Sequence, residues 1–228
     1  MIAALVRHGA YHQLPDTPSA HQPFPLTAEG EAHADEAARA VWVILQEKGW
    51  RLLPQIDSSR LLRGWQTATI MAGRLAALQG APFQVESFDA LAERGVGSAA
   101  NLTIAQIEAV LREDPRFPAP PPDWKADSHY RLPLQGAESL LEAGERVAEH
   151  IRRRAAEGHP ADTVKLFVGH GAAFRHAAYH LGVLAFEEIA RLSMYHGRPV
   201  FIEPGPDGRW RRVAGEWKIR GAQREAID

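Results

Sequence analysis

The stretch Ile2-Ala3-Ala4-Leu5-Val6-Arg7-His8-Gly9 sets the fold class of this chain. Its apolar run fits a buried strand, and a cation, an imidazole and a glycine follow where that strand would end. Ligands of open α/β sheets bind beyond the carboxyl ends of the strands. The stretch therefore predicts a central strand followed by a functional loop.

Outward from this stretch, strand patterns alternate with helical ones. The expected elements are a helix from Thr27 to about Lys48 closed by Gly49, a strand at 54–57, a helix at 61–78, a strand at 83–86, a helix after Gly136 with a Ser139–Glu142 capping box, a strand at 164–168, a helix at 172–180 and short strands within 192–217. This alternation predicts a single domain over 1–228. We expect a three-layer α/β/α sandwich with a mostly parallel sheet and a C-terminal β-hairpin.

One segment, 98–135, departs from the alternation. It contains one expected helix, at about 103–112, followed by a proline-rich stretch. A connection this long inside a compact domain is usually functional or disordered. We interpret it as a candidate lid insertion over the strand ends; a surface excursion without a role is the alternative. Trp124 within it is a candidate substrate contact.

The composition narrows the classes of function. The 228 residues carry a net charge of −2, which gives no reason to expect a nucleic acid or membrane partner. There is no cysteine, so disulfides, thiolate catalysis and Cys-ligated metals are excluded. No signal peptide and no membrane-length apolar run is apparent, and we expect a cytoplasmic protein.

A second polar motif lies where the strand at 54–57 gives way to a helix. Ser59 is placed to cap that helix, and Arg63 falls in its first turn. A cation is unfavourable beside the positive end of the helix dipole unless an anion binds there. The motif thus favours a phosphate site, although an Arg63 that faces solvent is an alternative.

Two further motifs follow later strands. Glu93, with Arg94 and Gly95 after it, offers a carboxyl for general acid catalysis, although surface Glu residues are common in loops. Gly169-His170-Gly171 repeats the pattern of strand, histidine and glycine seen at the start of the chain. Two histidines and two arginines at the strand ends of one sheet would enclose a small anion such as phosphate.

Together these pieces resemble a known family. Arg7-His8-Gly9, Ser59-x-x-x-Arg63-x-x-x-Thr67-Ala68, Leu91-x-Glu93 and Gly169-His170-Gly171 follow the order of the histidine phosphatase superfamily, also called phosphoglycerate-mutase-like. Leu26-Thr27-x-x-Gly30 and Gly136-x-Glu138-Ser139 are similar to its supporting motifs. The resemblance covers nearly the whole chain.

The resemblance implies roles for individual residues. His8 would attack phosphorus and form a phosphohistidine, and a backbone carbonyl would hold its other ring nitrogen. Arg7, Arg63 and His170 would bind the phosphoryl oxygens. Glu93 would protonate the leaving group. The resemblance implies no metal and no cofactor. Possible substrate-binding residues are Gly9, His12, Arg94 and Gly171.

The sequence also bears on the branch of this family. Ala10-Tyr11-His12-Gln13 stands where the mutase branch typically has Glu-Ser-x-x-Asn, whereas Glu93-Arg94 is similar to the mutase pattern. We expect the phosphatase branch: a metal-independent phosphomonoester hydrolase that acts on a small phosphorylated metabolite. A homodimer is a candidate assembly. A phosphoglycerate-type mutase and a phosphoprotein phosphatase are the alternatives, and a non-enzymatic phospholigand-binding protein ranks last.

The remaining histidines need no catalytic role. His176 and His180 have the helical spacing of a metal-binding pair, but the pattern supplies no third ligand. Surface or structural positions are expected for His21, His33, His129, His150, His159 and His196.

Overall fold

The computed structural model describes residues 1–221 and contains a six-stranded sheet in the order β3-β2-β4-β1-β6-β7. The strands are β1 (Ile2–Arg7), β2 (Arg51–Ser59), β3 (Gln84–Phe88), β4 (Thr163–Gly169), β6 (Val200–Pro204) and β7 (Trp210–Ala214). The four strands β3, β2, β4 and β1 are parallel, and β6 runs antiparallel to both β1 and β7. The mostly parallel sheet and the C-terminal hairpin are confirmed.

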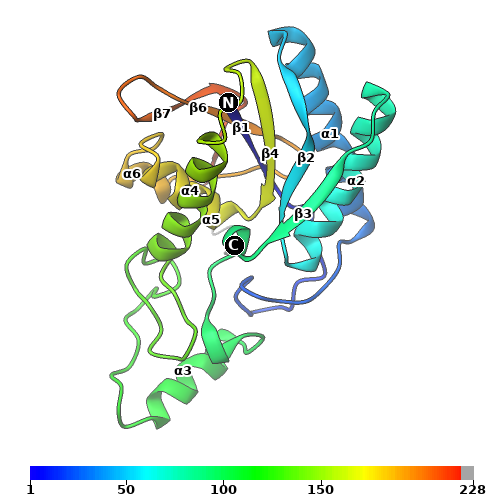
Figure 1. Ribbon diagram of the computed structural model, residues 1–228. Coiled ribbons are helices and arrows are strands. Elements are labelled where there is room, and N and C mark those ends of the chain that lie inside the picture. Colours follow the sequence, from blue (N-terminus) through cyan, green and yellow to red (C-terminus); the bar gives the residue numbers. More distant parts are fainter. Residues whose placement is uncertain (222–228) are drawn as a thin grey trace.

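Helices cover both faces of this sheet (Figure 1). The helices α1 (Ala28–Lys48) and α2 (Leu62–Gln79) pack on one face, and α4 (Leu140–Ala155) and α5 (Gly171–His180) pack on the other. The side chains of β1 alternate between the two cores, with Val6 on the α1/α2 side and Leu5 on the α4/α5 side. Burial on both faces explains why the first strand reads as a continuous apolar run.

The register of the two central strands positions the site. Ile2 of β1 pairs with Val164 of β4, and Arg7 pairs with Gly169 at the other end. Because the strands are parallel and end level with each other, the residues after them leave the sheet side by side. His8 and His170 are therefore neighbours, although 162 positions separate them in the sequence.

Local signals at the helix ends are largely confirmed. The Thr27 side chain accepts a hydrogen bond from the Gly30 N–H at the start of α1, and Gly49 closes that helix in the left-handed conformation, with φ of 66°. Ser139 and Glu142 form the expected capping box of α4. The structure adds one short helix, α6 (Phe186–Ile189), the 3₁₀ turns η1 (Asp89–Leu91) and η2 (Gly97–Ala99), and the two-stranded pair β5 (Leu192–Ser193) and β8 (Lys218–Ile219).

The prediction that Ser59 caps α2 is wrong. Leu61 is the N-cap residue, and no side chain caps this helix. The reason is that β2 continues past Asp57 to Ser59, paired with β3 along this end. Ser59 is therefore a strand residue, and its hydroxyl is available to the strand ends.

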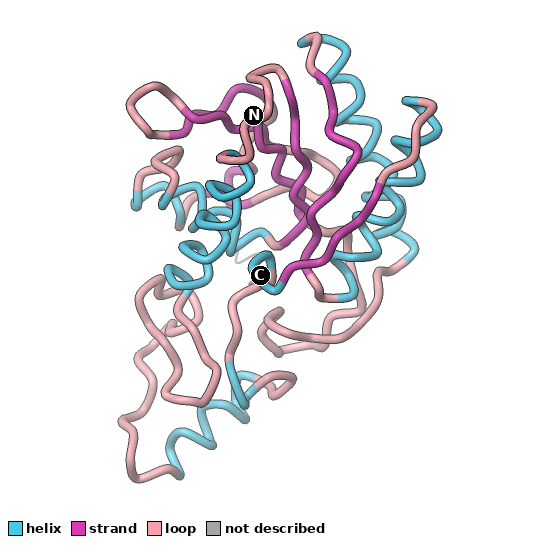
Figure 2. Tube along the Cα trace, in the orientation of Figure 1, coloured by secondary structure: helices cyan, strands magenta, loops and turns pink. Residues whose placement is uncertain are grey.

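The segment 98–135 extends beyond the carboxyl ends of the parallel strands (Figure 1). Apart from η2 and α3 (Ile104–Glu113), which Thr103 and Gln106 cap, it consists largely of loops (Figure 2). A hydrophobic cluster of its own holds it together, with Trp124 buried to 2% exposure. Trp124 is thus a core residue of the insertion.

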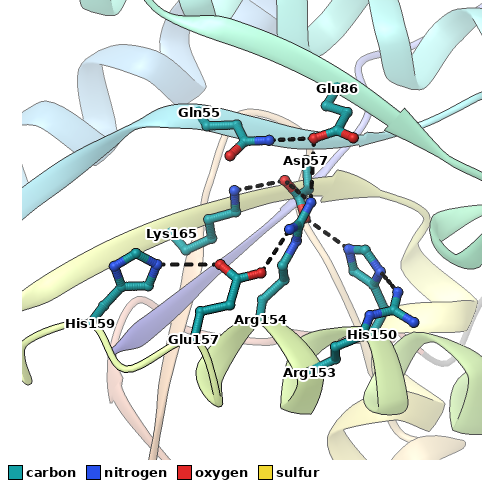
Figure 3. A network of polar contacts seen from close by, with 9 residues as sticks. All are labelled: Gln55, Asp57, Glu86, His150, Arg153, Arg154, Glu157, His159 and Lys165. Atoms are coloured by element: carbon teal, nitrogen blue, oxygen red, sulfur yellow. Dashed lines mark hydrogen bonds and ion pairs between the residues drawn. The ribbon is translucent and has the colours of Figure 1, made fainter.

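A buried network of charges joins β2, β4 and α4 (Figure 3). The Asp57 carboxylate accepts hydrogen bonds from His150 Nε2 at 2.8 Å and Arg154 Nε at 2.7 Å, and Lys165 Nζ lies 2.7 Å from its other oxygen. His150 Nδ1 accepts from Arg153, so the proton of this ring lies on Nε2. Burial raises the pKa of Asp57, but the contacts with His150, Lys165 and Arg154 outweigh burial and lower it below its ordinary value.

No helix within residues 1–221 is both long and apolar enough to cross a membrane.

Candidate active site

His8 and His170 meet at the carboxyl ends of β1 and β4. Their ring centroids are 4.9 Å apart, and the side chains are 3% and 0% exposed. The His8 N–H donates to the Gly169 carbonyl at 2.9 Å, which continues the β1–β4 pairing by one residue. The sheet therefore brings together two histidines that the sequence placed in separate motifs.

The ring of His8 has a defined tautomer. Its Nδ1 lies 2.7 Å from the Gly9 carbonyl, and because a carbonyl only accepts, Nδ1 carries the proton. Nε2 then carries the lone pair, which accepts from Arg63 Nε at 3.3 Å. Burial lowers the pKa of His8 well below 6.5, and the charges of Arg63 and Arg7 lower it further. His8 is thus neutral and carries a lone pair on Nε2.

Arg63 has no exposed surface and lies in the first turn of α2. Nη1 donates to the Gln22 carbonyl at 2.9 Å, and Nη2 donates to the carbonyls of Ser19 and Ala20 at 3.2 and 2.8 Å. The alternative of a solvent-facing Arg63 is therefore wrong. This guanidinium ties the loop after β1 to α2 and directs its Nε at His8.

The His170 ring is held through its Nε2. Its Nε2 lies 2.8 Å from Ser59 Oγ, which already accepts from the Leu61 N–H at 3.2 Å. With the Ser59 hydroxyl as the donor in this bond, Nδ1 carries the proton of the neutral His170 ring. This Nδ1 is fully buried and has no hydrogen-bond partner in the described chain. Burial lowers the pKa of His170 well below 6.5. A ring nitrogen without a partner thus belongs to the histidine next to His8.

Glu93 lies in the loop after η1 and is 4% exposed. Its Oε1 accepts from the Arg94 N–H at 2.9 Å. Burial lowers the pKa of Arg63, and the charge of Glu93 is among those that oppose this effect. The Glu93 carboxyl is therefore near enough to the Arg63 guanidinium to interact with it electrostatically.

A clamp from α4 fixes the backbone around Glu93. Arg146 Nη1 donates to the carbonyls of Asp89, Ala90 and Ala92 at 2.9 to 3.2 Å. Its Nη2 lies 2.6 Å from Glu138 Oε1, which also accepts from the Gly95 N–H at 3.0 Å. The Arg146–Glu138 ion pair thus holds the backbone on both sides of Glu93.

The other predicted phosphate and backbone positions are close by. Arg7 Nη1 donates to the Met194 carbonyl at 3.0 Å, and the charge of Arg7 acts on both His8 and Arg63. A Cβ on Gly9 would lie 2.1 Å from the Gly30 carbonyl oxygen, so the close approach at Gly9 is to α1. Gly171 is the first residue of α5. Contact of substrate with Gly9 or Gly171 stays a prediction.

The two remaining candidates differ in their surroundings. The side chain of His12 is exposed, whereas that of Arg94 is 8% exposed and lies over Trp124, with Cζ 5.8 Å from a ring centroid. Substrate binding by either residue stays a prediction.

The motifs missed two residues of the site, Tyr11 and His196, and gave a third, Ser59, another role. The Tyr11 ring lies edge-on to the His8 ring, with their centroids 5.4 Å apart. Arg63 Cζ lies 4.5 Å from the centroid of the same Tyr11 ring. The ring of His196 lies 6.0 Å from that of His8, and its Nδ1 donates to the His8 carbonyl. Ser59 was noticed, but as a helix cap. No spacing rule links Tyr11 or His196 to the strand ends, because tertiary packing alone brings them there.

Residues 1–221 contain no group of three or more His, Cys, Asp or Glu side chains arranged to hold a metal ion. The pair at helical spacing is engaged with backbone: His176 Nδ1 donates to the Ala172 carbonyl at 2.8 Å, and His180 Nε2 donates to the Leu141 carbonyl at 3.0 Å.

Solved structures share this fold. A mycobacterial glucosyl-3-phosphoglycerate phosphatase complexed with VO3 is 23% identical, with a TM-score of 0.66 over 96% of this chain and 99% of that one. A putative α-ribazole-5′-phosphate phosphatase from Escherichia coli is 18% identical, with a TM-score of 0.67 over 96% and 97%. At these identities the likeness concerns the fold.

Sequence comparison identifies the family. The 2,3-bisphosphoglycerate-dependent phosphoglycerate mutase of Hyphomonas neptunium (strain ATCC 15444) is 26% identical in an alignment of 225 positions that covers 90% of each chain. The model of the histidine phosphatase superfamily (branch 1) matches residues 3–214. The chain therefore belongs to the histidine phosphatase superfamily.

Proposed function

We propose that this protein is a metal-independent phosphomonoester hydrolase that acts through a phosphohistidine on a small phosphorylated metabolite. One observation carries the proposal. The rings of His8 and His170 lie with their centroids 4.9 Å apart beside two arginines, His8 Nε2 carries a lone pair, and Nδ1 of His170 has no partner in the described chain. A nucleophile needs such an arrangement, whereas a protein that only binds phosphate has no use for a lone pair there.

In the first step, His8 Nε2 attacks phosphorus and the bond from phosphorus to the ester oxygen breaks. Glu93 in its protonated form gives its proton to the leaving oxygen, so that an alcohol departs. Arg7, Arg63 and His170 stabilise the charge on the three nonbridging oxygens. In this site the arginines supply the positive charge that Mg²⁺ supplies in many phosphoryl-transfer enzymes.

In the second step, water attacks the phosphohistidine. The Glu93 carboxylate accepts a proton from that water, the bond from phosphorus to Nε2 breaks, and inorganic phosphate is released. His8 recovers its lone pair and Glu93 its proton. The hydrogen bond from His8 Nδ1 to the Gly9 carbonyl holds the same tautomer throughout the cycle.

A phosphoglycerate-type mutase is the second candidate. The Hyphomonas relative bears that name, and Glu93-Arg94 is similar to the mutase pattern. In a mutase the phosphoryl group returns to a substrate hydroxyl. Parallel assays of phosphate release and of phosphoglycerate isomerisation separate the two, and isomerisation without phosphate release would favour the mutase.

The phosphohistidine is tested by rapid quenching. We expect ³²P-labelled substrate to label the protein with an acid-labile, alkali-stable bond, and His8→Ala to abolish both labelling and turnover. His159→Ala, in the Asp57 network of Figure 3, is the control and should label normally. Activity should persist in EDTA and fall with vanadate. Labelling of His8→Ala, or a divalent ion needed to restore activity after EDTA, would refute the proposal.

A further inference from the structure

A cavity lies between α1 and the C-terminal hairpin of β6 and β7. Its volume is about 480 Å³, within the usual range for a small-molecule pocket. One wall is a stripe of α1, on which Glu36, Ala40 and Ile44 recur at intervals of four residues. The opposite wall consists of 197–199 before β6, Arg212 of β7 and 215–216 after it. The residues assigned to phosphate chemistry do not line this cavity.

The backbone sets the shape of this cavity. Gly197 has a φ of 70°, and a Cβ there would lie 3.0 Å from Glu36 Oε2. Gly215 also has a φ of 70°, and a Cβ there would lie 2.0 Å from the Pro199 carbonyl oxygen. The two glycines thus allow segments of the hairpin wall to approach α1 and each other closely. A cavity framed in this way is largely formed before a ligand arrives, which lowers the cost of binding.

Four charged side chains line the cavity, and two of them pair with each other. Arg198 Nη1 lies 3.6 Å from Glu216 Oε1. Arg212 Nη1 donates to the Gly215 carbonyl, and the other N–H groups of Arg212 have no partner within residues 1–221. The Glu36 carboxylate has no hydrogen bond or ion pair with those residues either. One available group of each sign therefore stands on opposite walls.

This arrangement restricts the chemistry of a ligand. A ligand with one charge would satisfy either Glu36 or Arg212 and would lie beside the other, which has the same sign as the ligand. Two charges of opposite sign satisfy both walls. Between them, Ala40, Ile44 and Pro199 offer apolar surface. The complementary ligand is therefore a small zwitterion with an apolar body.

We infer that this cavity binds an apolar α-amino acid. Glu36 accepts from its ammonium group, Arg212 donates to its carboxylate, and its side chain packs on the apolar surface of Ala40 and Ile44. The inference goes beyond the proposed function and does not depend on it. Because the charged groups at the rim are open to solvent, each contributes modestly to affinity.

The test compares three probes that differ in charge. Phenylalanine carries both charges, phenethylamine lacks the carboxylate, and 3-phenylpropionate lacks the ammonium group. The amide signals of Gly197 and Gly215 in ¹H–¹⁵N spectra report binding at the hairpin wall. We expect phenylalanine to bind about 3- to 10-fold more tightly than either analogue.

Two variants should remove this preference in opposite ways. In Glu36→Gln, phenylalanine should bind no better than 3-phenylpropionate but should keep its advantage over phenethylamine. In Arg212→Gln the reverse should hold. Glu47→Gln, at an exposed position of α1, and Arg211→Gln, next to Arg212 but paired with Glu203, should keep both preferences.

A third variant tests the location. Ala40→Phe fills the cavity and should abolish the shifts caused by all three probes. Equal affinity for the three probes, or binding that survives Ala40→Phe, would overturn the inference. The same holds for an absence of shifts at Gly197 and Gly215 with about 10 mM phenylalanine, which would exclude a Kd near 1 mM. Labelling of His8 tests the proposed function separately, so that either can fail alone.

Discussion

Two polar clusters with buried centres lie on this sheet and differ in charge balance. The Asp57 network holds three carboxylates (Asp57, Glu86 and Glu157) and three cations (Arg153, Arg154 and Lys165), which are joined by hydrogen bonds and ion pairs (Figure 3). The strand-end cluster, consisting of Arg7, His8, Arg63, Glu93 and His170, has two permanent cations and one carboxyl. In that cluster, Nδ1 of His170 has no partner in the described chain.

This difference separates a structural cluster from a ligand site. Complete pairing stabilises the folded chain and leaves nothing for a ligand to bind. Excess buried positive charge destabilises the folded chain until an anion arrives, and such strain is retained where function needs it. Removing a group from the Asp57 network should therefore affect stability, whereas removing one from the strand-end cluster should affect chemistry.

The largest effect is expected at Glu93. The alkoxide of an alkyl phosphate is a poor leaving group unless it is protonated. Glu93→Gln should therefore slow phosphorylation of His8 by such an ester about 10²- to 10⁴-fold. A nitrophenolate leaves without a proton, and its single-turnover step should change little. Rapid-quench labelling measures both rates. With the aryl ester, the variant should show a burst and then stall, because water attack still lacks its base.

Glu86 supplies the control for Glu93. It belongs to the Asp57 network, and Glu86→Gln should leave both rates near wild type. Equal losses with alkyl and aryl esters in Glu93→Gln would mean that Glu93 is not the acid. Glu138 would then be examined, although its bonds to Arg146 and Gly95 assign it to positioning the Glu93 loop.

The next effect is on stability. Asp57→Asn leaves Lys165 and Arg154 without their carboxylate and should lower the free energy of unfolding by about 3–5 kcal/mol, with kcat within a few-fold of wild type. The folded pKa of Asp57 is lowered, so the stability that its charge contributes is complete above the unfolded pKa of about 3.9. That contribution is lost as the pH falls from there through the folded pKa.

Urea unfolding at several pH values measures this effect. The gap between wild type and Asp57→Asn should narrow on acidification below pH 4. Asp162→Asn, which breaks an exposed pair with Arg51, should change stability little. A loss of kcat in Asp57→Asn as large as that in Glu93→Gln would remove the distinction between the two clusters.

The sequence predicted the strand-end cluster better than the Asp57 network for a physical reason. Parallel strands bring their carboxyl ends to one edge, so a histidine after each of two apolar runs is enough to predict that His8 and His170 meet. No comparable rule connects Asp57, His150 and Lys165, which come from β2, α4 and β4. His150 was expected to be surface or structural, and its burial in the network makes it structural.

Ser59 shows where local reasoning stops. Its place before a helix favoured a cap, but pairing with β3 extends β2 by two residues and carries Ser59 into the sheet. Strand pairing between β2 and β3 thus overrode the preference of the local sequence for a helix cap at Ser59. Its partner, His170, is 111 residues away and was already assigned to phosphate, so nothing in the spacing suggested the bond between them.

The smallest effect is expected at this bond. Ser59→Ala removes the donor that holds the proton of His170 on Nδ1, so inorganic phosphate should inhibit about 2- to 10-fold less strongly at neutral pH. Protonation of His170 puts a proton on both nitrogens whether or not Ser59 is present. The deficit, meaning the difference in phosphate inhibition between wild type and Ser59→Ala, should therefore shrink as the pH falls toward the pKa of His170, which lies well below 6.5. The neighbouring Ser58 bonds Ser87 Oγ at 3.1 Å, and Ser58→Ala should show no such deficit at any pH. A deficit in Ser59→Ala that stays constant with pH would show that the hydroxyl only supports the fold and that Ser59 does not set the tautomer of His170.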